Sequence, residues 1–129
     1  MKGLRRDEFE EIAQKAFDSL PDDFKSRVEN VHIAVEDYPS EDVLEGRNFE
    51  RTSLLGLYQG IPLTKRGVSY GMYPAVPDKI SLYQKNIEAY SKDEKELEKR
   101  IIEVLFHELG HYFGMEEHEI RRAMKRFNI

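Results

Sequence analysis

The sequence predicts an α+β fold in which helices at both ends of the chain enclose three short strands. Hydrophobic residues recur at helical spacing near the N-terminus and again after residue 91, whereas alternating hydrophobic positions mark the strands between them. The 129 residues, 40% of them hydrophobic and 35% charged, are typical of a well-solvated domain with its own core. We therefore expect residues 1–129 to form a single domain.

Composition narrows the classes of site and partner. The chain contains no Cys, so disulfides and thiolate ligands are excluded, and His and carboxylates are the remaining metal ligands. A net charge of -5 argues against nucleic acid or an anionic membrane as a partner. No hydrophobic run approaches the roughly 20 residues that span a bilayer. Because no hydrophobic segment follows the basic N-terminus either, we expect a cytoplasmic protein.

The first half of the chain begins with a helix. Hydrophobic residues recur every three or four positions from Asp7 to Leu20, and Pro21 ends the pattern. The first strand follows, because Val31, Ile33 and Val35 alternate with residues that would face the other side of a sheet.

The middle of the chain predicts two more strands separated by long loops. Residues from Asp37 to Arg51 are expected to form a loop, and Thr52 to Tyr58 the second strand, in which Gly56 marks a bulge or a close backbone approach. A second long loop from Gly60 to Asp78 precedes the third strand, Lys79 to Tyr83. Antiparallel pairing of these two strands across the loop is the expected arrangement.

The main helix is expected to open at a capping box formed by Ser91 and Glu94. Beyond its first two turns it is hydrophobic around most of its circumference, which is typical of a central helix. Gly114 is the expected stop, because Gly adopts the left-handed conformation that ends helices at little cost. A last helix is predicted from Glu116 to Phe127.

The end of the main helix carries the pattern on which the functional prediction rests. His107 and His111 lie roughly 40° apart around a helix and one turn apart along it, so both imidazoles can bind one metal ion. Glu108 lies beside them and can act as a general base for metal-activated water without binding the ion. After Gly114 the chain can turn back and offer Glu117 as a third ligand.

Glu117 and His118 are alternative third ligands. Glu117 follows from the spacing of the motif, whereas His118 is the softer and more usual zinc ligand but lies one residue further on. We favour Glu117. An ordinary amphipathic helix with two surface His is the competing interpretation, which the later Gly and acid make less attractive.

Two His and one carboxylate form a common catalytic zinc site that leaves a fourth position for water. Zinc lowers the pKa of that water, Glu108 takes its proton, and the hydroxide attacks a carbonyl group that the metal polarises. The prediction is amide hydrolysis with Zn²⁺ as cofactor, Glu108 as the catalytic residue and His107, His111 and Glu117 as ligands. Four tyrosines are candidate donors to the oxyanion: Tyr70, Tyr73, Tyr83 and Tyr112.

The run from His107 to Glu117 is similar to the extended zinc motif of metzincin proteases, with an acid in place of their third His. The closer likeness is to a family of uncharacterised minimal zincin-like bacterial proteins, regarded as possible zinc metallopeptidases. Members of that family show stretches resembling Leu54 to Tyr58, Pro62 to Gly67 and Pro77 to Ile80, in addition to a similar motif. The resemblance covers roughly residues 50 to 120.

The resemblance implies a minimal zincin-like fold, in which a small twisted mixed sheet packs against the motif helix between N- and C-terminal helices. It also implies a zinc-dependent metallopeptidase acting on a peptide or protein, which we expect to bind by strand addition at a sheet edge. A binding module that keeps the zincin fold without turnover is the main alternative. Hydrolysis of RNA is a third, suggested by a related His-rich motif in one bacterial endoribonuclease family. That motif lacks the Glu after the first His, and the acidity of this chain disfavours RNA.

Overall fold

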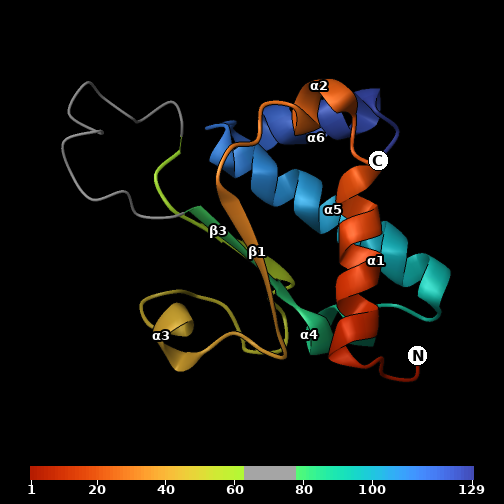
Figure 1. The fold of residues 1–129 in the computed structure, drawn as a ribbon. Coiled ribbons are helices and arrows are strands. Elements are labelled where there is room, and N and C mark those ends of the chain that lie inside the picture. The colour runs from red at the N-terminus through yellow and green to blue at the C-terminus, as the bar shows by residue number, and fades with distance from the viewer. Residues whose placement is uncertain (63–77) are drawn as a thin grey trace.

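The described residues, 1–62 and 78–129, form six helices and a three-stranded sheet in the computed structural model (Figure 1). The helices are α1 (Arg6–Asp18), α2 (Asp22–Lys25), α3 (Glu41–Leu44), α4 (Gln84–Ala89), α5 (Glu94–Tyr112) and α6 (Glu117–Arg126). The strands are β1 (Val31–Glu36), β2 (Gly56–Gln59) and β3 (Asp78–Tyr83). The long loop expected between Gly60 and Asp78 falls almost wholly outside the described residues. No described helix combines the length and apolarity needed to cross a membrane.

The sheet has β3 at its centre, in the order β1-β3-β2. β1 runs parallel to β3, with Ile33 opposite Ile80, and β2 runs antiparallel to it, with Tyr58 opposite Ile80. The mixed sheet and the antiparallel pairing of the second and third strands are therefore confirmed. β2 forms an edge of the described sheet.

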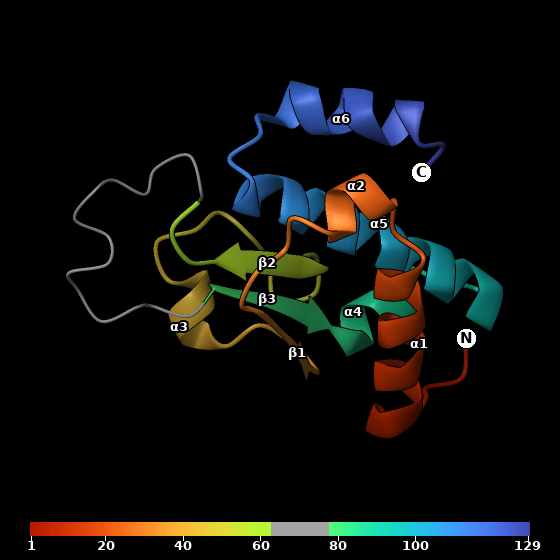
Figure 2. The ribbon, with the colours of Figure 1, turned by 45° about the horizontal axis from the view of Figure 1, so that its top comes forward.

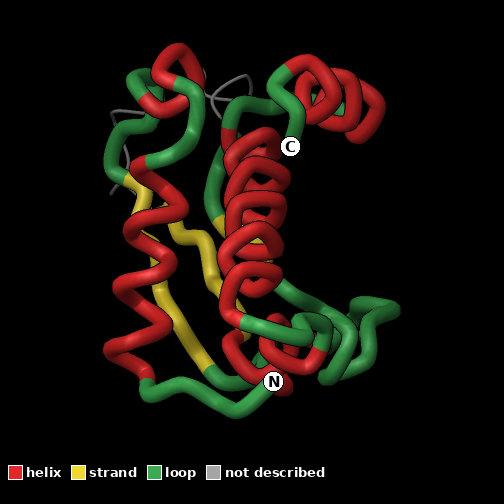
Figure 3. Tube along the Cα trace, turned by 90° about the vertical axis from the view of Figure 1, so that its right-hand side faces the viewer, coloured by secondary structure: helices red, strands yellow, loops and turns green. Residues whose placement is uncertain are grey.

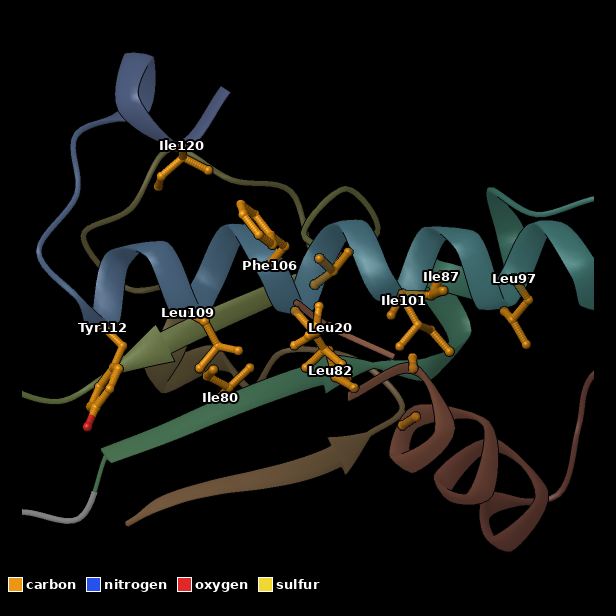
Figure 4. Close-up of a cluster of buried hydrophobic side chains, with 14 of the residues drawn as sticks. Leu20, Ile80, Leu82, Ile87, Leu97, Ile101, Phe106, Leu109, Tyr112 and Ile120 are labelled. Atoms are coloured by element: carbon orange, nitrogen blue, oxygen red, sulfur yellow. The ribbon is translucent and has the colours of Figure 1, made fainter. Parts of the chain in front are cut away.

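Helix α5 is the central helix, as its hydrophobic pattern predicted. It crosses one face of the sheet, with α6 on its opposite side (Figures 2 and 4). α1 lies beside α5 (Figure 3). Side chains from these elements, together with Leu20 just after α1, form the buried core, among them Phe9, Ala13, Ala16, Ile80, Leu82, Ile101, Leu105, Leu109 and Ile120. This arrangement places the end of α5 between the edge strand β2 and the start of α6.

The second strand is shorter than predicted. It spans Gly56–Gln59, whereas the hydrophobic residues suggested Thr52 to Tyr58. The side-chain amide of Asn86 donates hydrogen bonds of 2.8 Å to the carbonyl oxygens of Arg51 and Leu54. Because these carbonyls are satisfied by a side chain, the segment before Gly56 can remain a loop.

The start of α5 also differs from the prediction. Asp93, not Ser91, is the N-cap, and its carboxylate accepts a hydrogen bond of 2.8 Å from the backbone N–H of Glu96. The Ser91 hydroxyl instead donates to the carbonyl oxygen of Ile87, since α4 ends just before it. Asp caps a helix as well as Ser does, and the Ser91 hydroxyl is already bonded to the end of α4, so Asp93 is left to cap α5.

Candidate metal centre

The last two turns of α5 bring His107 and His111 together. Their ring centroids lie 4.7 Å apart and the ring planes are nearly perpendicular, at 85°. About one third of each side chain is exposed, 35% for His107 and 33% for His111. The pair therefore lies at a wall of the core with its outer side open to solvent.

A tight turn ends α5 and reverses the chain. Gly114 adopts a left-handed conformation, with φ of 81°, which confirms it as the predicted stop. Its backbone N–H donates to the carbonyl oxygen of His111, and the N–H of Met115 donates to that of Gly110, each over 2.9 Å. This pattern is a Schellman motif, and it returns the chain toward α5 so that α6 can begin beside the His pair.

Glu117, the first residue of α6, reaches back to both His side chains. Both of its carboxylate oxygens lie 3.0 Å from Nε2 of His107, and Oε1 lies 3.0 Å from Nε2 of His111. The two imidazole nitrogens therefore face one carboxylate. Neighbouring His118 is exposed on α6 and forms no hydrogen bond or ion pair with any described residue.

Glu108 lies on the inner side of the His pair and is buried. Its Oε2 lies 2.6 Å from Nδ1 of His107, and its Oε1 accepts a hydrogen bond of 2.9 Å from the backbone N–H of Tyr58 on β2. Gly56 allows β2 to lie this close to α5, because a Cβ at position 56 would lie 2.5 Å from Cγ1 of Val104 on α5. The close backbone approach predicted for Gly56 is confirmed. The role of the Tyr58 backbone was not predicted, since a main-chain donor leaves no mark in a sequence.

Two of the four tyrosines proposed as oxyanion donors lie within the described core. Tyr83 and Tyr112 are fully buried. The Tyr112 hydroxyl bonds to the backbone N–H and carbonyl oxygen of Glu29, so its hydrogen-bonding capacity is used within the core. Tyr70 and Tyr73 lie outside the described residues.

The residues present fit a zinc ion. In a tetrahedral site with bonds of about 2.0–2.1 Å, ligand atoms lie about 3.4 Å apart, close to the 3.0 Å separations between the Glu117 carboxylate and the two Nε2 atoms. His107, Glu108 and His111 also offer donor atoms within 4.8 Å of one another. However, the Glu108 carboxylate is hydrogen-bonded toward Nδ1 of His107, whereas Glu117 faces Nε2 of both rings. Nε2 of His107, Nε2 of His111 and the Glu117 carboxylate therefore face one another, and these three groups form the candidate ligand set.

Two carboxylates favour the protonated form of His107. The hydrogen bond with Glu108 is the main cause that raises the pKa of His107 to about 9, and contacts with Glu117 raise it further against the opposing effect of burial. The hydrogen bond with His107 in turn lowers the pKa of Glu117. A metal ion binding through His107 must therefore displace a proton.

We expect the free energy of unfolding of the chelator-treated protein to fall as the pH rises from about 6.5 to above 9. The pKa of His107 in the folded chain, about 9, exceeds the ordinary value of 6.5. Its contribution is therefore complete below pH 6.5 and is lost as the pH rises through 9. Urea unfolding across this range measures the effect. Glu108→Gln removes the carboxylate that mainly raises the pKa of His107, so the stability of this variant should depend less on pH. The same pH dependence in the variant and the wild-type protein would show that His107 is not its source.

Comparison with known proteins identifies a family and a similar fold. A family model described as zincin-like metallopeptidase matches residues 28–126. A solved structure described as a conserved hypothetical protein from Thermo thermophilus is similar to this chain, with 25% sequence identity and a TM-score of 0.52. The alignment covers 85% of this chain and 94% of that one, and it supports the predicted zincin-like fold. No curated protein matches. Since the family match spans most of the sequence, this chain belongs to the zincin-like metallopeptidase family.

Proposed function

We propose that this protein is a zinc-dependent peptidase, with His107, His111 and Glu117 as the metal ligands. The observation that carries the proposal is the convergence of two Nε2 atoms on one carboxylate, 3.0 Å from each. Two His and one carboxylate form the ligand set of many catalytic zinc sites. The lowered pKa of Glu117 keeps this carboxylate ionised, which ligation requires.

Bound at this position, zinc supplies a Lewis acid that polarises a peptide carbonyl and lowers the pKa of a water molecule. The chain itself supplies the base and holds it in place. Glu108 accepts the proton of the attacking water on a carboxylate oxygen. An ionised carboxylate offers about four lone-pair positions, and the contacts with His107 and Tyr58 occupy two of them. The Glu108 carboxylate can therefore still accept a proton.

Glu108 also orients a ligand. When His107 binds a metal through Nε2, its Nδ1 carries the hydrogen and donates it to Glu108 at 2.6 Å. A buried carboxylate behind a metal-binding imidazole fixes the tautomer and the orientation of the ring. One residue thus serves as base and as positioning group.

The substrate is a peptide or protein segment in extended form. β2 forms an edge of the described sheet and lies beside Glu108, so a peptide strand added to this edge would pass the metal ligands. This mode of binding uses main-chain hydrogen bonds and leaves the sequence preference to side-chain contacts.

Metal analysis of protein purified without added zinc tests the proposal. We expect about one zinc ion per chain, because the ligand set is complete within one chain. Cleavage of a peptide library should stop after treatment with a chelator and return on addition of zinc. Protein that contains no metal, and takes up none on titration, would overturn the proposal.

A further inference from the structure

A close contact between Gly110 and Ile120 joins α5 to α6 beside the metal centre. Gly110 lies between the two His in the sequence of α5 and is buried. A Cβ at this position would lie 2.6 Å from Cγ1 and 2.7 Å from Cδ1 of Ile120. Ile120 is fully buried, and its side chain points from α6 toward α5 (Figure 4). The isoleucine therefore occupies the space that any larger residue at position 110 would need.

We propose that this contact sets the position of Glu117 over the His pair, so that Gly110 and Ile120 are positioning residues of the metal centre. The inference rests on the proposed function, because it concerns how that site obtains its third ligand. Ile120 lies three residues after Glu117 on the same helix, about 4.5 Å along its axis. At that distance a helix moves as a unit, so a shift of Ile120 is transmitted to Glu117.

Little else holds the Glu117 carboxylate. Its side chain is 54% exposed, and within the described residues its hydrogen bonds and ion pairs are made with His107 and His111 alone. The aromatic contact of Phe106 on α5 with Phe127 lies at the opposite end of α6, where Phe127 is the C-cap. The placement of Glu117 therefore depends on how the first turns of α6 sit on α5.

The distances around Gly110 show how far Ile120 would have to move to make room for a larger residue. Ordinary contact begins at 3.4 Å, so an alanine at position 110 requires Cγ1 of Ile120 to move by about 0.8 Å from its 2.6 Å position. A metal site tolerates about 0.2 Å in its ligand distances. The isoleucine cannot easily turn aside, because a β-branched side chain has one strongly preferred rotamer in a helix. We infer that α6 shifts instead and withdraws Glu117.

The test compares zinc affinity and the visible absorption spectrum of the Co²⁺-substituted protein across variants. Gly110→Ala should raise the zinc dissociation constant at least about tenfold and give a Co²⁺ spectrum like that of Glu117→Ala. Adding Ile120→Ala should restore most of the affinity and the wild-type spectrum, because Cβ of residue 120 lies 3.6 Å from the new methyl group. Gly3→Ala is a matched control, since nothing lies closer than 3.6 Å to a Cβ there.

If Gly110→Ala fails to fold, Ile120→Ala alone provides the test. It should weaken zinc binding because α6 loses the side chain that packs against Gly110. The double variant should bind zinc more tightly than Ile120→Ala. Wild-type affinity and spectrum in Gly110→Ala or in Ile120→Ala would overturn the inference. Loss of zinc in Glu117→Ala together with that result would leave the proposed function standing, whereas absence of zinc from the wild-type protein would remove both.

Discussion

Replacing Glu108 with Gln should lower the rate of peptide cleavage by roughly 10²–10⁴-fold, the range attributed to a single general base. The side chain keeps its size but can no longer accept a proton from water. Tyr58 and His107 contact different carboxylate oxygens, and Gln replaces one of these oxygens with an NH₂ group that cannot accept a hydrogen bond. We therefore expect zinc affinity to fall by about 10- to 100-fold as well, the usual cost of losing a group behind a ligand.

The measurement is kcat on a cleaved peptide at saturating zinc, so that the weaker affinity does not imitate the loss of the base. Glu103→Gln is the matched control, because Glu103 lies five residues earlier on α5 and pairs with Arg100. Full activity of Glu108→Gln under these conditions would remove Glu108 from the chemical step. If a cellular effect of the protein persisted unchanged in Glu108→Gln, the binding-module alternative would be favoured over turnover.

Replacing Glu117 with Ala should raise the zinc dissociation constant by more than about 100-fold, because removal of a ligand costs more than loss of the group behind one. The neighbouring substitution His118→Ala should change the dissociation constant by no more than about threefold. His118 neither belongs to the proposed ligand set nor makes a polar contact with one of its members, so its loss should cost little affinity. Both residues can bind zinc in principle, but Glu117 faces the two Nε2 atoms, whereas His118 makes no polar contact with a described residue. Competition with a chromophoric chelator measures both constants.

The two substitutions lie next to each other at the start of α6, so each controls for general damage to that helix. Far-UV circular dichroism and thermal unfolding should show both variants folded, since both side chains are exposed. The opposite pattern, in which His118→Ala loses zinc and Glu117→Ala retains it, would assign the third ligand to His118 and require α6 to rotate on metal binding.

Local patterns in the sequence identified the elements that carry the site. The helical spacing of His107 and His111 and the stop at Gly114 each depend on residues within one or two turns. Such features are predictable because backbone geometry fixes which neighbours meet. The third strand agreed with the prediction to within one residue, since it is buried and alternates regularly.

The loop predicted from Asp37 to Arg51 contains the four-residue helix α3, Glu41–Leu44, which Ser40 caps. Two other predictions failed because a competing partner was available. Ser91 and Asp93 are both suitable caps, and the end of α4 decided between them. The segment before Gly56 has the hydrophobic residues of a strand, yet Asn86 binds its carbonyl groups. Each outcome depended on a group that the local pattern does not contain. Propensity gives way to tertiary contact in such cases.

The sequence by itself determined the residue types of the candidate site and their spacing along α5, because a helix places residues i and i+4 on one side whatever surrounds it. Only the tertiary structure decided which carboxylate faces the Nε2 atoms and what holds the other one. Glu108 accepts a hydrogen bond from the backbone of Tyr58, 50 residues earlier in the chain. The position that we propose for Glu117 depends on the packing of Ile120 against Gly110. These contacts join elements that meet only when the core packs, and the close packing of that core sets their distances.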